Sequence, residues 1–125
     1  MLQKEFIVDG YEHIIHIEHE ESGLDAFIVI HNTKLGPAIG GIRCHSYSNT
    51  EAQLDDTLRL SEGMTLKTAA AGLNHGGGKA TINALKIKDR SLAYQILGQA
   101  VEELKGSYIC AGDVGTTVED LFKVK

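Results

Sequence analysis

The sequence predicts one α/β domain, a three-layer α/β/α arrangement around a mixed sheet. Three observations lead to this prediction. The 125 residues are enough for one buried core but too few for two domains. Apolar residues make up 42% of the chain and charged residues 23%, which is ordinary for a globular protein. Patterns typical of strands and helices follow in the order strand, strand, strand, helix, strand, helix, strand, helix.

Runs of β-branched and aromatic residues between turn signals predict the strands. The run that begins at Leu24 is almost continuously apolar, which is typical of a central strand. Gly40 and Gly41 interrupt another run, and glycine in a strand pattern indicates a bulge or a close approach of another group. The predicted strands cover residues 11–19, 24–31, 38–44, 79–84 and 108–111.

Capping signals and apolar residues at helical spacing predict three helices. Thr50 opens a T-x-x-Q capping box, and the helix that follows is expected to end near Ala70. Asp89 or Ser91 caps a second helix, which ends at a Lys-Gly stop, and another capping box opens a third helix at Thr116. The inward faces expected for the first two helices are Leu54, Leu58, Ser61 and Thr65, and Leu92, Ile96, Ala100 and Leu104.

Charge and targeting signals exclude several classes of protein. The net charge of -5 argues against a nucleic-acid partner or an anionic membrane surface. No apolar run approaches the roughly 20 residues that span a bilayer, and the first residues lack the apolar core of a signal peptide. Cys44 and Cys110 are too few for a disulfide framework, so a reduced, cytoplasmic setting is expected.

The strongest chemical signal lies between Gly63 and Lys79, where two lysines bracket small residues and a triple-glycine loop. Lys67 falls near the end of the first predicted helix, and Asp113 follows a predicted strand at its C-terminal end, where ligands of such sheets collect. Two lysines close together in a partly buried site repel each other and lose hydration. At least one of them should therefore have a lowered pKa. Such a lysine can act as an acid or an electrostatic catalyst, with an aspartate to shuttle protons.

Each of these signals also has a plainer explanation. Both lysines could be solvated, with Asp113 merely capping a turn. Residues 76–78 could form a phosphate cradle, but no Ser or Thr follows the lysine and a strand is expected next. His13, His16 and His19 alternate between the two faces of a strand, so a solvated face is expected there and no metal site is predicted.

Four motifs occur in this order: LGPAIGGIR at residues 35–43, GMTLK at 63–67, GGGK at 76–79 and GDVGT at 112–116. Together they resemble the N-terminal domain of the Glu/Leu/Phe/Val dehydrogenases, with the leucine dehydrogenase branch as the best match. The resemblance extends from about Glu20 to the last residue. It implies NAD(P)-dependent, reversible oxidative deamination of an L-amino acid to its 2-oxo acid and ammonia.

The resemblance also implies roles for single residues. Lys67 would grip the substrate α-carboxylate, and Lys79 would polarise the carbonyl and stabilise the oxyanion of the carbinolamine. Asp113 would exchange protons with ammonia or the amino group. Ile39 stands where glutamate-specific members carry a lysine, so an apolar amino acid such as leucine is the expected substrate. The other implied substrate-binding residues are Gly40, Gly41 and Ala111.

Members of the family carry a second, Rossmann domain, whereas residues 1–125 contain no G-x-G-x-x-G fingerprint with a distant acidic residue. We therefore expect one substrate-binding and oligomerisation domain that lacks the NAD-binding domain and is inactive alone. The alternative is a non-catalytic, stand-alone binding or oligomerisation module of the same fold. The resemblance implies a homo-oligomer, for which a sheet edge near the N-terminus could pair between subunits.

Overall fold

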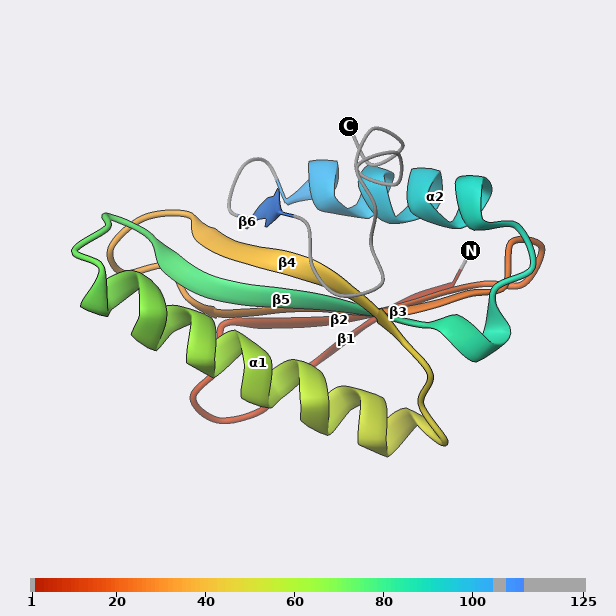
Figure 1. Cartoon of the computed structure of the whole chain (residues 1–125), viewed down its shortest axis with the longest axis horizontal. Helices are drawn as coiled ribbons and strands as arrows, with labels where there is room; N and C mark the ends of the chain where they lie inside the picture. The colour runs from red at the N-terminus through yellow and green to blue at the C-terminus, as the bar shows by residue number, and fades with distance from the viewer. Residues whose placement is uncertain (1, 105–107, 112–125) are drawn as a thin grey trace.

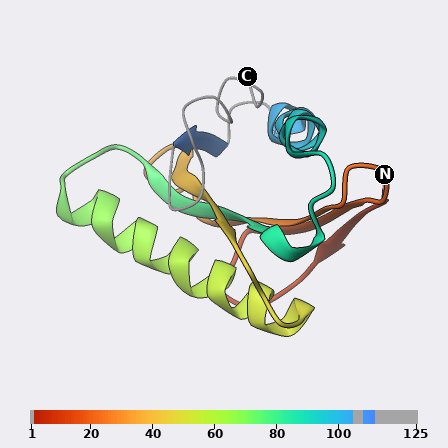
Figure 2. The ribbon, with the colours of Figure 1, turned by 45° about the vertical axis from the view of Figure 1, so that its right-hand side comes forward.

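The computed structural model describes residues 2–104 and 108–111. These residues form a six-stranded mixed sheet in the order β1-β2-β3-β5-β4-β6. Helix α1 (Thr50–Ala70) covers one face of the sheet and helix α2 (Arg90–Glu103) covers the other, which confirms the three-layer α/β/α prediction (Figure 1, Figure 2). The remaining elements are β1 (Leu2–Phe6), β2 (His13–His19), β3 (Leu24–Asn32), β4 (Ala38–His45), β5 (Gly76–Asn83), the 3-10 turn η1 (Ala84–Lys86) and β6 (Tyr108–Ala111).

The sheet is antiparallel from β1 to β5 and parallel from β5 through β4 to β6. Parallel neighbours need a crossover, which α1 provides between β4 and β5 and α2 provides between β5 and β6. The second crossover moves back across the sheet in the direction opposite to the first. Since crossovers are right-handed, the two helices must lie on opposite faces.

The larger apolar core lies between the sheet and α2. Ile15 and Ile17 of β2 are both buried there, as the strand alternation predicted, and Tyr94 and Leu97 of α2 pack against the same layer. A smaller apolar cluster on the α1 face contains Ile14, Phe27 and Val29. β3 contributes to both clusters and is buried from Leu24 to Ile30, as expected of a central strand.

Helix α1 ends at Ala70 as predicted, but its cap and its buried face differ from the prediction. Asn49 is the N-cap, and its side chain accepts a hydrogen bond from the Ala52 N–H at 2.8 Å. Gln53 does not fold back to complete a capping box, because its amide is buried and donates to the Asp25 carbonyl at 3.1 Å. The buried residues of α1 are the polar Gln53, Thr57, Ser61 and Thr68, while Leu54 and Leu58 are only partly buried.

The face of α2 is also rotated from the prediction. Asp89 caps the helix by accepting from the Leu92 N–H at 3.1 Å, which is one of the two predicted caps. Leu92 itself is only half-buried, because the helix turns the small Ala93 and Gly98 toward the sheet beside its larger core residues. The third helix predicted at Thr116 lies outside the described residues.

Two strands differ clearly from the prediction. β1 was not predicted at all, because this edge strand is exposed along its whole length and carries no apolar alternation. β5 begins at Gly76, three residues before the predicted start at Lys79, so the triple glycine belongs to a strand and not to a loop.

Candidate functional site

The triple glycine lies in the most enclosed strand of the sheet, where there is no room for side chains. A Cβ on Gly77 would come within 2.5 Å of the Thr65 Oγ1 of α1. A Cβ on Gly78, on the opposite face, would come within 2.7 Å of the Tyr108 ring. These glycines therefore let α1 and Tyr108 approach the two faces of β5 closely. Their backbone pairs with strands on both sides, so the segment is not a phosphate cradle.

Lys79 lies on the α1 face of β5. Its strand neighbours on this face are Gly77, which meets α1 at Thr65, and Thr81, whose hydroxyl lies 2.7 Å from that of Thr57. The lysine is 7% exposed, which is unusual for this residue type. The explanation that both lysines are merely solvated is therefore wrong for Lys79.

Burial lowers the pKa of Lys79 below the ordinary lysine value, and the positive charges of Lys67 and Arg43 lower it further. The carboxylate of Asp56 acts in the opposite direction. This confirms the prediction that at least one of the two lysines has a lowered pKa. Lys67 belongs to the last turn of α1, with an exposed side chain that remains close enough to influence Lys79.

Strand β4 supplies the neighbouring part of the same face. Ile39 pairs with Gly77 in the parallel register, so Ile39, Gly41 and Arg43 alternate onto the α1 side of the sheet. Helix α1 packs mainly on β5 and β3 and contacts β4 much less, so this face of β4 is less covered (Figure 2). The side chains of Ile39 and Arg43 are accordingly only half-buried.

Gly40 lies on the other face of β4, where a Cβ would overlap the Gly78 carbonyl and come within 2.9 Å of the Tyr108 hydroxyl. That hydroxyl donates to the Gly41 carbonyl at 2.9 Å. Of the two explanations predicted for glycine in this strand, close approach is correct for Gly40. Its lack of a side chain lets β4 lie tightly against β5 and Tyr108 of β6.

A cluster of charged and polar side chains follows Lys79 along this face. The Asp56 carboxylate of α1 accepts 2.6 Å hydrogen bonds from the Tyr47 hydroxyl and from Arg59, and it lies 3.4 Å from the Arg43 Nε. Burial raises the pKa of Tyr47, and Asp56 raises it further. The sequence analysis did not single out Asp56 or Tyr47. The i,i+3 spacing of Asp56 and Arg59 signals only an ordinary helix-surface pair.

The expected position at the C-terminal end of a strand applied to Asp113, and the other candidate residues lie elsewhere. Ile39, Gly41 and Lys79 all belong to the first halves of β4 and β5, so the site lies on the face of the sheet. Ala111 of β6 pairs with Gly41, which places its backbone beside the site. Asp113 lies outside the described residues.

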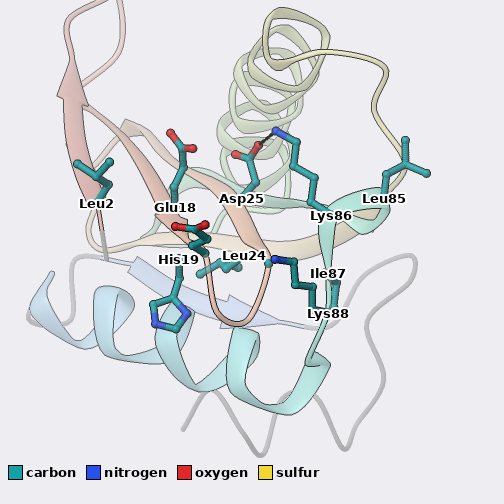
Figure 3. Close-up of a pocket in the computed structure, with 11 residues that line it drawn as sticks. Leu2, Glu18, His19, Leu24, Asp25, Leu85, Lys86, Ile87 and Lys88 are labelled. Carbon is teal, nitrogen blue, oxygen red and sulfur yellow. Dashed lines mark hydrogen bonds and ion pairs between the residues drawn. The ribbon is translucent and has the colours of Figure 1, made fainter.

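A pocket of about 790 Å³ lies elsewhere, around the β2–β3 turn and the segment after β5 (Figure 3). None of its lining residues is a candidate catalytic or substrate-binding residue. On its wall the Lys86 ammonium donates to the Asp25 carboxylate at 2.6 Å (Figure 3). These two charges form an exposed-to-buried ion pair, whereas the lysine of the candidate site is itself buried and has a lowered pKa. The chemistry therefore favours the site at Lys79.

His16 corrects the prediction of a solvated histidine face. It is buried, its Nε2 lies 2.7 Å from the Asp25 carboxylate, and its ring stacks on Phe27 at a centroid distance of 4.2 Å. His13 is exposed, as expected. Among the residues that the structure describes, no three His, Cys, Asp or Glu side chains cluster as a metal site would require. No described helix is long and apolar enough to span a bilayer.

Comparisons with known proteins identify a family and solved structures that are similar to this chain. Residues 11–124 match the family described as Glu/Leu/Phe/Val dehydrogenase, dimerisation domain. Leucine dehydrogenase of Bacillus subtilis is 51% identical over 112 residues, and phenylalanine dehydrogenase of Lysinibacillus sphaericus is 47% identical over 114 residues. The matches cover 89% and 90% of this chain but only 31% and 30% of those proteins.

The crystal structure of L-tryptophan dehydrogenase from Nostoc punctiforme superposes with a TM-score of 0.85 at 39% identity. That match covers 92% of this chain and 34% of the tryptophan dehydrogenase chain. The similarity therefore extends over nearly all of the present chain but about a third of its relatives.

Proposed function

The chain belongs to the Glu/Leu/Phe/Val dehydrogenase family, and we propose that it supplies the substrate-binding half of an amino-acid dehydrogenase active site. In this proposal Lys67 binds the α-carboxylate of an apolar L-amino acid or its 2-oxo acid. Lys79 polarises the carbonyl, and Asp113 exchanges protons with the nitrogen. Lys79 carries the proposal, because a buried lysine with a lowered pKa costs stability, and such groups concentrate at functional sites.

The charges at the site suit a 2-oxo acid. Lys67, Lys79 and Arg43 place three cations around one partly open face, and Asp56 is the acidic group that opposes them at Lys79. A substrate carboxylate would be attracted to this face by the excess of positive charge. An ammonium or hydroxyl positioned at the carbonyl oxygen would stabilise the oxyanion that forms when ammonia adds.

Ile39 supports an apolar substrate side chain. It lies beside Gly77 on the site face and offers no cation to a second carboxylate. Among leucine, valine, isoleucine and phenylalanine, a difference of one methylene is worth about 1–3 kcal/mol in such a pocket. The proposal is therefore for an apolar class of substrate, with leucine as its representative.

The described residues do not fit a nicotinamide dinucleotide. The triple-glycine segment among them is buried in β5 and paired on both sides, so its N–H groups are not free to bind a pyrophosphate. Hydride transfer to NAD therefore needs residues other than these, and we assign no step of it here. We accordingly propose that the 125-residue chain is inactive alone. NAD reduction with leucine by the purified chain would contradict this.

Substrate binding can be tested on the chain itself. We expect 4-methyl-2-oxopentanoate, the 2-oxo acid of leucine, to shift backbone amide signals of β4, β5 and the end of α1 in a heteronuclear NMR titration. Lys67→Ala should weaken this binding at least about tenfold, which corresponds to about 1.4 kcal/mol. Lys88→Ala, an exposed lysine beyond η1, should leave it unchanged. Equal weakening by both variants, or no binding to the wild-type chain, would refute the proposed role.

Association between subunits is the second part of the proposal, since the matching family is described as a dimerisation domain. β1 is an edge strand of the sheet, so its free backbone edge could pair with another copy of the chain. Leu2 within the strand and Ile7 directly after it are both exposed and could be buried in such an interface. We expect light scattering to give a mass of at least a dimer, and Leu2→Lys combined with Ile7→Lys to reduce it. Leu73→Lys, on the loop after α1, is the matched control. A monomeric wild-type chain at high concentration would contradict this.

A further inference from the structure

The cluster around Asp56 has no place in the roles implied for Lys67, Lys79 and Asp113, yet it adjoins Lys79 on the same face. Three groups contact the Asp56 carboxylate. The Tyr47 hydroxyl and the Arg59 guanidinium each hydrogen-bond to it at 2.6 Å, and the Arg43 Nε lies at 3.4 Å. The carboxylate is thus held in one position from three sides, although α1 is a surface helix.

Arg43 is the member of the cluster that belongs to a strand of the site. It follows Gly41 on the same face of β4 and pairs with Thr81, the next residue after Lys79 on the α1 face of β5. Its side chain is only 27% exposed. Within the described residues its Nε is buried and makes the Asp56 ion contact without a hydrogen bond. Electrostatic attraction to Asp56 therefore keeps this guanidinium beside Lys79.

We propose that Arg43 and Asp56 are positioning residues, a fixed charge pair that tunes proton transfer at Lys79. The proposal rests on the function proposed above, because only a lysine that takes part in chemistry needs such tuning. Arg43 disfavours the protonated form of Lys79, and Asp56 favours it. Because the two charges are tied to each other, their opposite effects on the lysine act together and partly cancel.

The other groups near Lys79 differ from the Arg43–Asp56 pair in charge or in exposure. Lys67 of α1 lowers the pKa of Lys79 more than Arg43 does, but its side chain is exposed and it is not one of the groups that contact Asp56. From β3 the paired neighbour is the apolar Val29, and the nearest titratable group on that strand face is His31, whose Nδ1 lies 2.7 Å from the Thr65 hydroxyl. Among the described residues, Asp56 is the acidic group that acts on Lys79.

A pH titration of the lysine side chains by NMR tests this in the ligand-free chain. The Lys79 signal is assigned as the one lost in Lys79→Met. Asp56→Asn should move the pKa of Lys79 downward, because Arg43 is left uncompensated. Arg43→Gln should move it upward, because Asp56 is left uncompensated. A merely structural role predicts a different pattern, since loosening of the site exposes Lys79 and raises its pKa in both variants.

Three further variants keep the test decisive if one of these proteins folds poorly. Arg43→Lys preserves the charge and should leave the pKa of Lys79 near the wild-type value. Arg59→Gln removes an exposed cation on the outer side of Asp56 and should shift it less than Arg43→Gln does. Tyr47→Phe removes a hydrogen bond to Asp56 but keeps the charges of Arg43, Asp56 and Arg59. The pKa of Lys79 should therefore stay at its wild-type value.

Shifts of the same sign in Asp56→Asn and Arg43→Gln, or no shift in either, would overturn the charge-pair role. These titrations contain no 2-oxo acid. If the chain fails to bind 4-methyl-2-oxopentanoate but the two variants shift the pKa of Lys79 in opposite directions, the charge-pair role stands and the proposed function is refuted. If the chain binds the 2-oxo acid but the shifts are absent or of the same sign, the proposed function stands and the charge-pair role is refuted.

Discussion

Gly77 of β5 lies directly against Thr65 of α1, with no space between them for a methyl group. A Cβ on Gly77 would overlap the Thr65 backbone nitrogen and come within 2.5 Å of its Oγ1. The Thr65 hydroxyl is in turn held at 2.7 Å by His31. This contact fixes the distance between α1 and the sheet, and therefore the distance between Lys67 on the helix and Lys79 on the strand.

We expect Gly77→Ala to destabilise the chain by about 1–3 kcal/mol, the usual cost of forcing extra volume into a packed core. Gly63→Ala is the matched control, because Gly63 lies within α1 and a Cβ there meets nothing within 4 Å. Replacing a helical glycine with alanine should stabilise the chain by about 0.5–1 kcal/mol. Urea unfolding of both variants provides the measurement. Equal effects at the two positions would show that the contact with Thr65 does not matter.

Asp25 should make stability depend on pH in acid. Burial would raise the pKa of this carboxyl, but the hydrogen bonds from His16 and Lys86 outweigh it and hold the pKa below the ordinary value of 3.8. The unfolded chain therefore binds the proton more readily than the folded chain. This stabilisation is complete above the ordinary value and is lost as the pH falls through the lower folded-state pKa.

We expect Asp25→Asn to cost about 1.5–3 kcal/mol near neutral pH, the range for a hydrogen bond to a charged group. The difference from wild type should shrink as the pH is lowered below 3.8. Unfolding free energies measured by urea from pH 2 to pH 7 would show this convergence. Asp55→Asn, an exposed carboxylate on α1, should change little at any pH. A constant difference between wild type and Asp25→Asn would contradict the lowered pKa.

Lys79 should decrease the stability of the fold. Its folded-state pKa is lowered, so the unfolded chain binds the proton more readily, and stability rises with pH between that pKa and the ordinary value of 10.5. Lys79→Met should stabilise the chain at neutral pH by about 0.5–2 kcal/mol, as removal of a functional group often does. The variant should also show a smaller increase in the free energy of unfolding as the pH is raised toward 10.5. Loss of stability in Lys79→Met would indicate a structural role for the ammonium.

Ile39→Lys should redirect binding toward a 2-oxo acid with a second carboxylate. The new ammonium would lie on the site face beside Gly77, where it could pair with a side-chain carboxylate. We expect 2-oxoglutarate to bind more tightly and 4-methyl-2-oxopentanoate more weakly, each measured by NMR titration. Leu35→Lys adds the same charge at an exposed loop position and controls for general attraction. The same gain in both variants would refute a specificity role for Ile39.

Local signals predicted most of the fold. The helix bounds at Ala70 and the cap at Asp89 follow from nearest-neighbour chemistry, which is visible in sequence. The buried run of β3 is a composition signal of the same kind. The unpredicted strand β1 shows the limit of such signals, because an exposed edge strand is defined by its partner β2 and not by its own residues.

The sequence by itself determined the order of strands and helices and the mixed sheet, and it singled out Lys67 and Lys79 as candidate site residues. Only the tertiary structure decided that the triple glycine is a buried strand, that His16 bonds to Asp25, and that Gln53 faces the sheet. It also brought Arg43 and Asp56 beside Lys79. The physical reason is that the spacing of apolar residues along the chain indicates only which face of a helix or strand turns inward. What it meets there depends on the register and layer distance of segments far apart in the chain.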